Sequence, residues 1–401
     1  MNVSDDLMAP DTVADPYAYF NRLRAVDPVH HNTQIGAFIV TRYDDVQAAF
    51  RDERLSADRI TPYYQPKLSG PNREMLLPAY ENLSKWMVFL DPPDHSRLRS
   101  LVVKAFTPRV IEALRQSIRD TVRELLDEAG QHEMDFIHAF AYPLPVIVVS
   151  DMFGMPREDR DKIKHWSDEI MLVVMGALDV QDRHERARRA FVDFEEYLRG
   201  RIAERRRTPR EDLLSLLLAA EERGDALSEQ EILSTCLMLL FAGHETTTNL
   251  LANALLGLLQ HPAQLELLRR EPNVLTPAIE EFLRYDGPAK AMWRIAKEDL
   301  ALGGKMIPKG GRVLLVIAAA HRDPERFDAP DTFDLRREKN PHLGFGFGAH
   351  YCLGAPLARL ETELAFTEIL ARYPRITLAE SALEWHPTVL TRSLKTLRIA
   401  Y

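Results

Sequence analysis

The chain has 401 residues, of which 46% are hydrophobic and 28% are charged, so it is long enough to bury a large core. Its formal net charge of −9 argues against nucleic acid as a partner, because phosphate binding requires a basic surface. Two cysteines, Cys236 and Cys352, are too few for a disulfide scaffold and are typical of a reducing compartment. The N-terminal residues lack an apolar signal core, and no apolar run is long enough to span a bilayer. We therefore expect a cytoplasmic protein that does not contact a membrane.

No linker, repeat or low-complexity segment divides the chain, which predicts one mainly helical domain over 1–401 with a loose segment at 1–14. Residues 60–90 are rich in Pro, Gly and Asn and are predicted to form a long loop. The remaining pattern predicts helices at 16–26, 44–51, 143–153, 156–175, 182–207, 212–220 and 228–260, and strands at 37–41, 313–320, 376–378 and 390–399.

The helix predicted at 228–260 breaks local rules at its centre. Ser228 and Glu231 form a capping box at its start. The segment Ala242-Gly-His-Glu-Thr-Thr-Thr248 then combines a glycine, a charged residue and three threonines, all of which are unfavourable inside an apolar helix. Threonine hydroxyls could simply bond to preceding carbonyls and bend the helix. Several broken rules at one point nevertheless suggest a functional position.

The stretch Phe345-Gly-Phe-Gly-Ala-His-Tyr-Cys-Leu-Gly354 places Cys352 among glycines, before a helix predicted at 353–370. Glycines allow a tight backbone bulge against a flat ligand. A helix N-terminus favours negative charge and therefore suits a thiolate.

Other interpretations of this stretch are open. A single intracellular cysteine is often a small buried side chain. Gly344-x-Gly346 also fits a loose dinucleotide-binding pattern, although no buried strand precedes it. A zinc site made of His342, His350 and Cys352 would lack a fourth ligand.

The ten residues resemble the haem-binding signature of the cytochrome P450 family, with matches at Phe345, Gly348, His350, Cys352 and Gly354. The resemblance extends from Asp15 to Tyr401 and is closest to soluble bacterial members. It implies a mainly α fold with small β-sheets, a triangular single domain and a long central helix. It also implies bound haem b, with Cys352 as the axial ligand of the iron.

The resemblance also assigns roles to the centre of the long helix. Ala242, Gly243, Glu245 and Thr246 match the segment beside the oxygen site. Gly243 would leave room for dioxygen, whereas Glu245 and Thr246 would deliver protons during its activation. His244 falls at a variable position and receives no role.

Further family positions are implied on the haem side. His95 and Arg99 lie one helical turn apart and would bind haem propionates, although the pair alone could be a solvated polar stripe. Arg294 and His350 match further propionate-binding positions. Glu281 and Arg284 match the family's Glu-x-x-Arg pair, an ordinary surface ion pair when taken alone, with Arg326 as the implied third partner.

The candidate substrate-contacting residues are mostly apolar, so we expect a hydrophobic substrate of moderate or large size. They are Trp86, Val88, Phe89, Met171, Val174, Met175, Met292 and Leu390. Lys290 could pair with a substrate carboxylate, although an exposed lysine is the simpler interpretation. Macrolides, terpenoids, steroids and fatty acids all fit, as in secondary metabolism.

The activity implied by the resemblance is that of a haem-thiolate monooxygenase that hydroxylates or epoxidises its substrate with O₂. The chain contains no flavin or iron–sulfur segment, so electrons from NAD(P)H would arrive through a reductase and a ferredoxin or flavodoxin-type protein. Basic candidates for that docking surface are Arg97, Lys104, Arg336, Arg337 and Arg359. A peroxide-using, coupling or rearranging haem-thiolate enzyme and a non-enzymatic haem protein are the alternatives. We expect a monomer.

Overall fold

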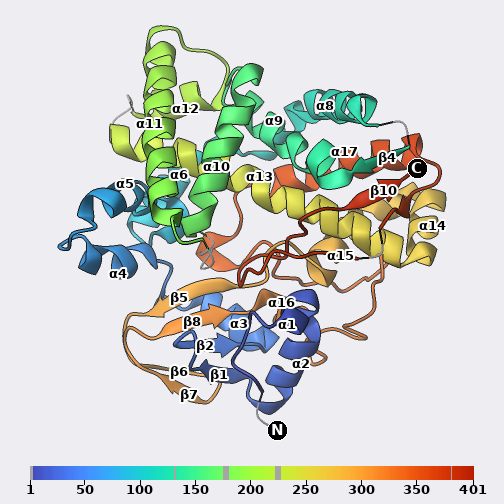
Figure 1. Cartoon of the computed structure of the whole chain (residues 1–401), viewed down its shortest axis with the longest axis horizontal. Helices are drawn as coiled ribbons and strands as arrows, with labels where there is room; N and C mark the ends of the chain where they lie inside the picture. Colours follow the sequence, from blue (N-terminus) through green and yellow to red (C-terminus); the bar gives the residue numbers. More distant parts are fainter. Residues whose placement is uncertain (1–2, 131, 175–179, 222–226, 381) are drawn as a thin grey trace. The chain divides into compact units, whose positions relative to one another are not determined.

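The computed structural model describes residues 3–130, 132–174, 180–221, 227–380 and 382–401. The chain forms two compact units, and each is described by itself (Figure 1). Unit 1 comprises Met1–Leu55, Ile111–Leu144 and Thr246–Tyr401. Unit 2 comprises Ser56–Val110 and Pro145–Glu245. The expected single domain over 1–401 stays a prediction.

Unit 1 combines helices with the β-sheets. Its helices are α1 (Pro10–Ala14), α2 (Pro16–Val26), α3 (Tyr43–Arg51), α8 (Arg115–Glu128), α14 (Pro262–Arg270), α15 (Leu275–Tyr285), α16 (Ile317–Ala320) and α17 (Ala355–Arg372), with shorter turns at η4 (Ile137–Ala141), η6 (Pro272–Val274) and η7 (Gly348–His350). Its strands are β1 (Val29–Asn32), β2 (Ala37–Val40), β4 (Glu133–Asp135), β5 (Met292–Ala296), β6 (Leu300–Leu302), β7 (Lys305–Ile307), β8 (Arg312–Leu315), β9 (Thr377–Leu378) and β10 (Arg398–Ala400).

Unit 2 is helical. Its elements are α4 (Ile60–Tyr64), η1 (Gln65–Lys67), α5 (Arg73–Leu83), η2 (Met87–Phe89), α6 (Asp94–Val102), η3 (Val103–Ala105), η5 (Arg157–Asp159), α10 (Arg160–Val174), α11 (Arg183–Arg207) and α12 (Leu213–Glu221). Elements that cross a unit boundary are β3 (Leu55–Ser56), α7 (Pro108–Ala113), α9 (Pro143–Met152) and α13 (Glu229–Gln260).

The largest sheet has the strand order β1-β2-β8-β5-β3. β1 and β5 pair antiparallel with their neighbours β2 and β8, whereas β2 and β8 pair parallel, with Ala37 opposite Arg312. Parallel neighbours cannot be joined by a tight hairpin, so the long stretch of chain between β2 and β8 is required by the topology. β4, β10 and β9 form a second sheet, and β6 and β7 form a hairpin.

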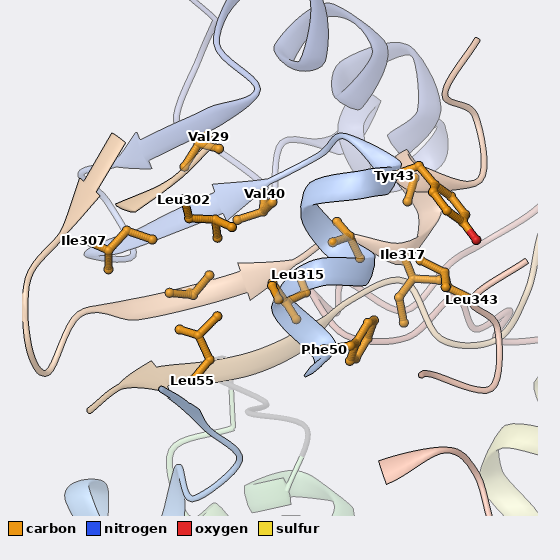
Figure 2. Close-up of a cluster of buried hydrophobic side chains, with 14 of the residues drawn as sticks. Val29, Val40, Tyr43, Phe50, Leu55, Leu302, Ile307, Leu315, Ile317 and Leu343 are labelled. Atoms are coloured by element: carbon orange, nitrogen blue, oxygen red, sulfur yellow. The ribbon is translucent and has the colours of Figure 1, made fainter. Parts of the chain in front are cut away.

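A hydrophobic cluster joins this sheet to α3 and to the chain that leads into Cys352. Figure 2 shows Tyr43 and Phe50 of α3 beside strand residues such as Leu315. Leu343 belongs to the same cluster, and Phe347 packs against it. Because protein interiors are close-packed, displacing this loop would open a void in the core of the sheet.

The helix predicted at 228–260 is confirmed as α13, Glu229–Gln260, and it is the long yellow helix of Figure 1. The backbone N–H of Ser228 donates to the Glu231 carboxylate at 2.8 Å, and the N–H of Glu231 donates to Ser228 Oγ at 3.3 Å. The capping box is therefore present, and Arg97 of α6 also pairs with Glu231.

Three predicted elements differ from the structure. The strand expected at 390–399 forms only at its end, as β10 from Arg398 to Ala400. The long loop expected at 60–90 contains α4 and α5. Leu76, Ala79 and Leu83 form a buried stripe along α5, which packs against α11 despite the internal Pro78. The strand expected at 313–320 ends as β8 at Leu315, and α16 follows. An unbroken apolar run has no periodicity that separates a buried strand from a buried helix.

The segment expected to be loose at 1–14 makes specific contacts. The Asp5 carboxylate accepts hydrogen bonds from the Thr33 N–H at 2.7 Å and the Thr33 hydroxyl at 2.6 Å, and it lies 2.7 Å from His30 Nε2. These bonds, led by the Thr33 hydroxyl, lower the pKa of Asp5 to about 2. Among the described residues, no helix combines the length and apolar character that crossing a membrane requires.

Glu361 is a buried acid on α17 and generates a stability prediction. The residue is 1% exposed, and no described group donates to its Oε2. Burial raises its pKa to about 8. The folded protein therefore holds a proton that the unfolded chain loses above its ordinary carboxyl pKa, so stability falls as pH rises towards 8 and is flat above it.

We expect Glu361→Gln to raise the free energy of unfolding by on the order of 3 kcal/mol at about pH 8, and to have little effect at about pH 4.5. Denaturant unfolding of both proteins across this range measures the difference. The matched control is Glu363→Gln, because Glu363 is a partly exposed residue on the same helix that pairs with Arg115. A pH-independent difference for Glu361→Gln would contradict a neutral buried carboxyl.

Candidate functional site

The loop that carries Cys352 is open at the sulfur and ordered in its backbone. Cys352 is a free, exposed cysteine, and its N–H donates to the Phe345 carbonyl at 2.9 Å. Helix α17 begins at Ala355 with Gly354 as its N-cap, two residues later than the predicted helix start. The thiol therefore lies just outside the helix N-terminus rather than inside its first turn.

Gly348 has a backbone that suits glycine alone. Its φ is +72°, which side chains with a Cβ rarely adopt, and an added Cβ would lie 3.3 Å from the Phe50 carbonyl oxygen. The loop thus approaches the end of α3 closely. At the same point the guanidinium of exposed Arg51 lies 4.2 Å from the centre of the Phe347 ring.

Two histidines hold the start of the cysteine loop through its backbone. His321 Nδ1 lies 3.0 Å from the Arg284 carbonyl, so this nitrogen donates, and Nε2 accepts from the Leu343 N–H at 2.8 Å. His342 Nδ1 accepts from the Gly344 N–H at 3.0 Å. Burial lowers the pKa of His321 well below its ordinary value, consistent with a neutral ring that bridges two backbone groups.

His342 also belongs to a polar cluster behind the loop. Its Nε2 lies 2.8 Å from the Glu280 carboxylate, which accepts two further bonds from Arg359 at 2.7 and 2.8 Å. Burial alone would raise the pKa of Glu280, but these hydrogen bonds outweigh it and lower the value to about 2. The Arg359 guanidinium lies 4.6 Å from the centre of the Phe345 ring. The cluster therefore fixes the Phe345 ring, and the carbonyl of the same residue accepts the hydrogen bond from the Cys352 N–H.

The hydrogen bonds of His342 argue against the zinc interpretation. Both ring nitrogens of His342 are engaged, one with the Gly344 N–H and one with Glu280, so neither faces a metal. Within the described residues, no group of three or more His, Cys, Asp and Glu side chains is arranged to hold a metal ion.

Glu281 and Arg284 form a fully buried ion pair, as predicted, with two N–O distances of 2.8 Å. The assignment of Arg326 as the third partner of this pair is wrong. Its guanidinium lies 4.9 Å from the Tyr43 ring centre, and Arg337 instead donates to Glu281 at 3.1 Å. Arg337 also binds the carbonyls of Asp328, Ala329 and Thr332. The sequence placed Arg337 on an exposed docking surface, whereas 9% of its side chain is exposed.

At the centre of α13, Ala242 and Thr246 are exposed and lie one helical turn apart, whereas most neighbouring residues are buried. His244 is buried, its Nδ1 lies 2.8 Å from the Leu240 carbonyl, and burial lowers its pKa. A Cβ at Gly243 would lie 3.2 Å from Val149 of α9, so close helix packing gives this glycine a structural reason.

The four residues predicted to bind propionates do not all lie in one unit. His95 and Arg99 share α6 in unit 2, and burial followed by the Arg99 charge lowers the pKa of His95. His95 is 1% exposed, which excludes a solvated stripe for this side chain. In unit 1, His350 lies in η7 and Arg294 in β5, where Arg294 is 7% exposed and its guanidinium lies 5.4 Å from the Phe50 ring centre.

The predicted substrate-contacting residues differ in exposure. Trp86 is core: it is 1% exposed, its indole N–H donates to Asn82 at 2.6 Å, and it stacks on Phe89 at 5.8 Å. Phe89 is also buried, at 5% exposed, and substrate contact by Trp86 and Phe89 stays a prediction. Val88 and Met292 are exposed, Met171 is half-buried, and Val174 and Leu390 are buried. Met175 lies outside the described residues.

Sequence reasoning missed several residues that hold the loop. The roles of His321, Glu280 and Arg337 had no sequence signal beyond their residue types, because their partners are distant in the chain. His342 was considered only as a zinc ligand. Lys290, for which exposure was the simpler expectation, is 6% exposed, and that expectation is wrong.

Comparisons with known proteins agree on one family. A family model described as Cytochrome P450 matches residues 37–384. Cytochrome P450 CYP107DY1 of Priestia megaterium is 40% identical, covering 99% of this chain and 98% of that protein. The structure of P450BioI in complex with hexadec-9Z-enoic acid ligated acyl carrier protein is 36% identical, with a TM-score of 0.91 over 98% of this chain and 100% of the other. Myxobacterial CYP267B1 in complex with myristic acid is 37% identical, with a TM-score of 0.89 over 98% of each chain.

The two arginines near Glu281 give a direct test of the corrected network. We expect Arg337→Met to lower the free energy of unfolding by about 3 kcal/mol, because it removes one of the cations that compensate a buried carboxylate. Arg326→Met should cost about 1 kcal/mol or less, since it removes an exposed charge and a side-chain contact with Tyr43. Methionine keeps the apolar stem in both variants.

Equilibrium denaturation of the two variants beside the parent protein measures these costs. Equal losses, or a larger loss for Arg326→Met, would return Arg326 to the network and remove Arg337 from it.

Proposed function

Because the chain belongs to the cytochrome P450 family, we propose that it is a haem-thiolate monooxygenase that uses O₂ and two externally supplied electrons to hydroxylate or epoxidise a hydrophobic small molecule. The observation that carries the proposal is exposed Cys352 on a loop whose start is held through the Leu343 and Gly344 N–H groups. A family with this activity makes the chain an oxidoreductase, and haem is its cofactor.

The residues around Cys352 fit the thiolate side of a haem. Cys352 is exposed although the loop packs on the core, and a Cβ added at Gly354 would lie 4.0 Å from its sulfur. When bound, thiolate-ligated haem supplies the oxygen chemistry and favours O–O cleavage. His350 and Arg294 in unit 1, and His95 and Arg99 in unit 2, would bind its propionates and orient it.

Two residues of α13 are proposed to handle protons. Thr246 carries a hydroxyl that can both accept and donate, and Glu245 carries a carboxyl that can resupply a proton to it. The support is their position: Thr246 is exposed at the centre of a mainly buried helix, next to Ala242 one turn away. Gly243 would keep this part of the helix surface narrow for O₂, in addition to packing against Val149.

The substrate is proposed to be a mainly apolar molecule, in keeping with the apolar residues that the resemblance assigns to its contacts: Val88, Met171, Val174, Met292 and Leu390. Two related structures hold fatty acyl groups, one as an acyl carrier protein conjugate and one as myristic acid. A third related structure, that of CYP109E1, holds testosterone, so the relatives support an apolar substrate rather than one chemical class.

Electrons are proposed to come from NAD(P)H through a reductase and a small ferredoxin or flavodoxin-type protein. Arg97, Arg336 and Arg359 already pair with Glu231, Glu271 and Glu280, which reduces their availability to an acidic partner. Arg51 is a better candidate, because it is exposed and lies against Phe347 of the cysteine loop. Lys104 also stays in the proposed docking surface.

The thiolate assignment is tested by reducing the purified holoprotein and adding carbon monoxide. We expect the red-shifted absorption that thiolate coordination produces. Cys352→Ser should abolish this band, whereas Cys236→Ala, which changes a fully buried cysteine of α13, should retain it. Retention of the band in Cys352→Ser, or a parent protein without it, would remove the proposed function.

The proton-delivery assignment is tested with Thr246→Ala. We expect the variant to consume NADPH but to divert most electrons to hydrogen peroxide or water, so that product per electron falls about tenfold or more. Thr248→Ala is the matched control, because Thr248 is a buried threonine two positions along the same helix. Unchanged coupling in Thr246→Ala would remove the threonine from proton delivery.

A further inference from the structure

Lys290 lies in an extended segment between α15 and β5, and its backbone is held on both sides. Its N–H donates to the Leu390 carbonyl at 2.8 Å, and its own carbonyl accepts from the Ala318 N–H at 3.0 Å. The adjacent residue Ala289 bridges to Thr391 in an antiparallel manner. The backbone therefore cannot move Lys290 out to solvent without breaking these bonds.

The side chain of Lys290 is buried, and its charge is poorly compensated. The residue is 6% exposed, and among the described residues its ammonium has one hydrogen-bond acceptor, the carbonyl of Thr388. A lysine ammonium has three donors, so two are not used by that part of the chain. Burial, followed by the nearby charge of Arg392, lowers the pKa of Lys290 to about 7.

The nearest acid is already committed elsewhere. The Asp286 carboxylate accepts from the Tyr17 hydroxyl at 2.6 Å and from Arg392 at 3.2 Å. Arg392 is itself further bound to the carbonyls of Val13 and Ala14. Within the described chain, no carboxylate forms an ion pair with Lys290, and Asp286, whose charge acts on Lys290, is paired with Arg392.

The position of Lys290 connects it with the proposed substrate. Met292, the first residue of β5, follows two residues later. Leu390, whose carbonyl binds the Lys290 N–H, is the other residue of unit 1 proposed to contact substrate. Lys290 is therefore near one proposed substrate contact in the chain and is hydrogen-bonded through its backbone to the other.

We propose that Lys290 binds the carboxylate of the substrate, and that the substrate is therefore a free carboxylic acid with an apolar body. This inference rests on the proposed monooxygenase function. A carboxylate supplies the missing negative charge and accepts the two unused ammonium donors, and such charge-assisted bonds are stronger than neutral ones. It also offsets the cost of keeping a cation out of water. The apolar body would then extend along Met292 and Leu390.

A purely structural role would use different properties of Lys290. If Lys290 only linked residues 290 and 388, its side chain would need one hydrogen-bond donor and no charge. Ligand preference separates the two roles, because only an ionic site distinguishes an acid from its neutral ester.

The experiment compares dodecanoic acid with methyl dodecanoate and dodecan-1-ol, measured by calorimetry on the haem-loaded protein. We expect the acid to bind at least about tenfold more tightly than the ester. Lys290→Met should remove this preference while it retains ester binding. Lys290→Arg, which keeps a cation, should retain part of the preference. Lys309→Met is the control, because Lys309 is an exposed lysine of the same unit, and it should behave as the parent protein.

A second readout distinguishes an ionic role from a packing role. At about pH 8, acid binding by the parent protein should take up protons, seen as a dependence of the binding heat on buffer ionisation enthalpy, since the bound carboxylate favours the charged lysine. Lys290→Met should show no uptake. Equal affinity for acid and ester in the parent protein, or an acid preference that survives in Lys290→Met, would overturn the inference. The carbon monoxide spectrum of each variant shows whether the haem-thiolate assignment stands independently.

Discussion

The buried ion pair between Glu281 and Arg284 is the interaction on which the cysteine loop depends. Both side chains are fully buried, so the pair is favourable only if its remaining donors and acceptors are satisfied. Arg284 meets this requirement by binding the carbonyls of His321, Pro330 and Thr332. His321 in turn bridges the Arg284 carbonyl to the Leu343 N–H, where the loop begins. The requirement to satisfy one buried charge thus fixes the chain that presents the thiol.

The elements that the sequence predicted correctly have strong local signals. The capping box at Ser228 and the start of the helix predicted at 16–26, which is α2, both depend on residues within one turn of each other. The prediction of a long loop at 60–90 was wrong for the opposite reason. Its Pro and Gly suggested a loop, whereas the stripe of Leu76, Ala79 and Leu83 forms a helix because it packs against α11. Tertiary packing outweighed local propensity there.

The site residues also separate into those that local motifs predict and those that depend on distant contacts. Cys352 and the Glu281–Arg284 pair could be found from motifs, because each motif lies within a few residues. The choice between Arg326 and Arg337 could not, since both arginines follow Glu281 at a distance and nothing local shows which one folds back. Lys290 is the clearest case: its burial depends on a contact with residue 388, which lies 98 positions later.

Two of the buried cations of unit 1, Arg284 and Lys290, can be compared directly. Arg284 has its charge opposed by Glu281 and its other donors bound to carbonyls, as a structural charge requires. Among the residues that the structure describes, Lys290 has one carbonyl acceptor and no carboxylate in ion-pair contact. A methionine at this position would fill similar space without desolvating a charge, and a glutamine could still donate to Thr388. Filling space and donating to Thr388 therefore do not require an ammonium. The positive charge is explained by an anion that the described chain does not supply.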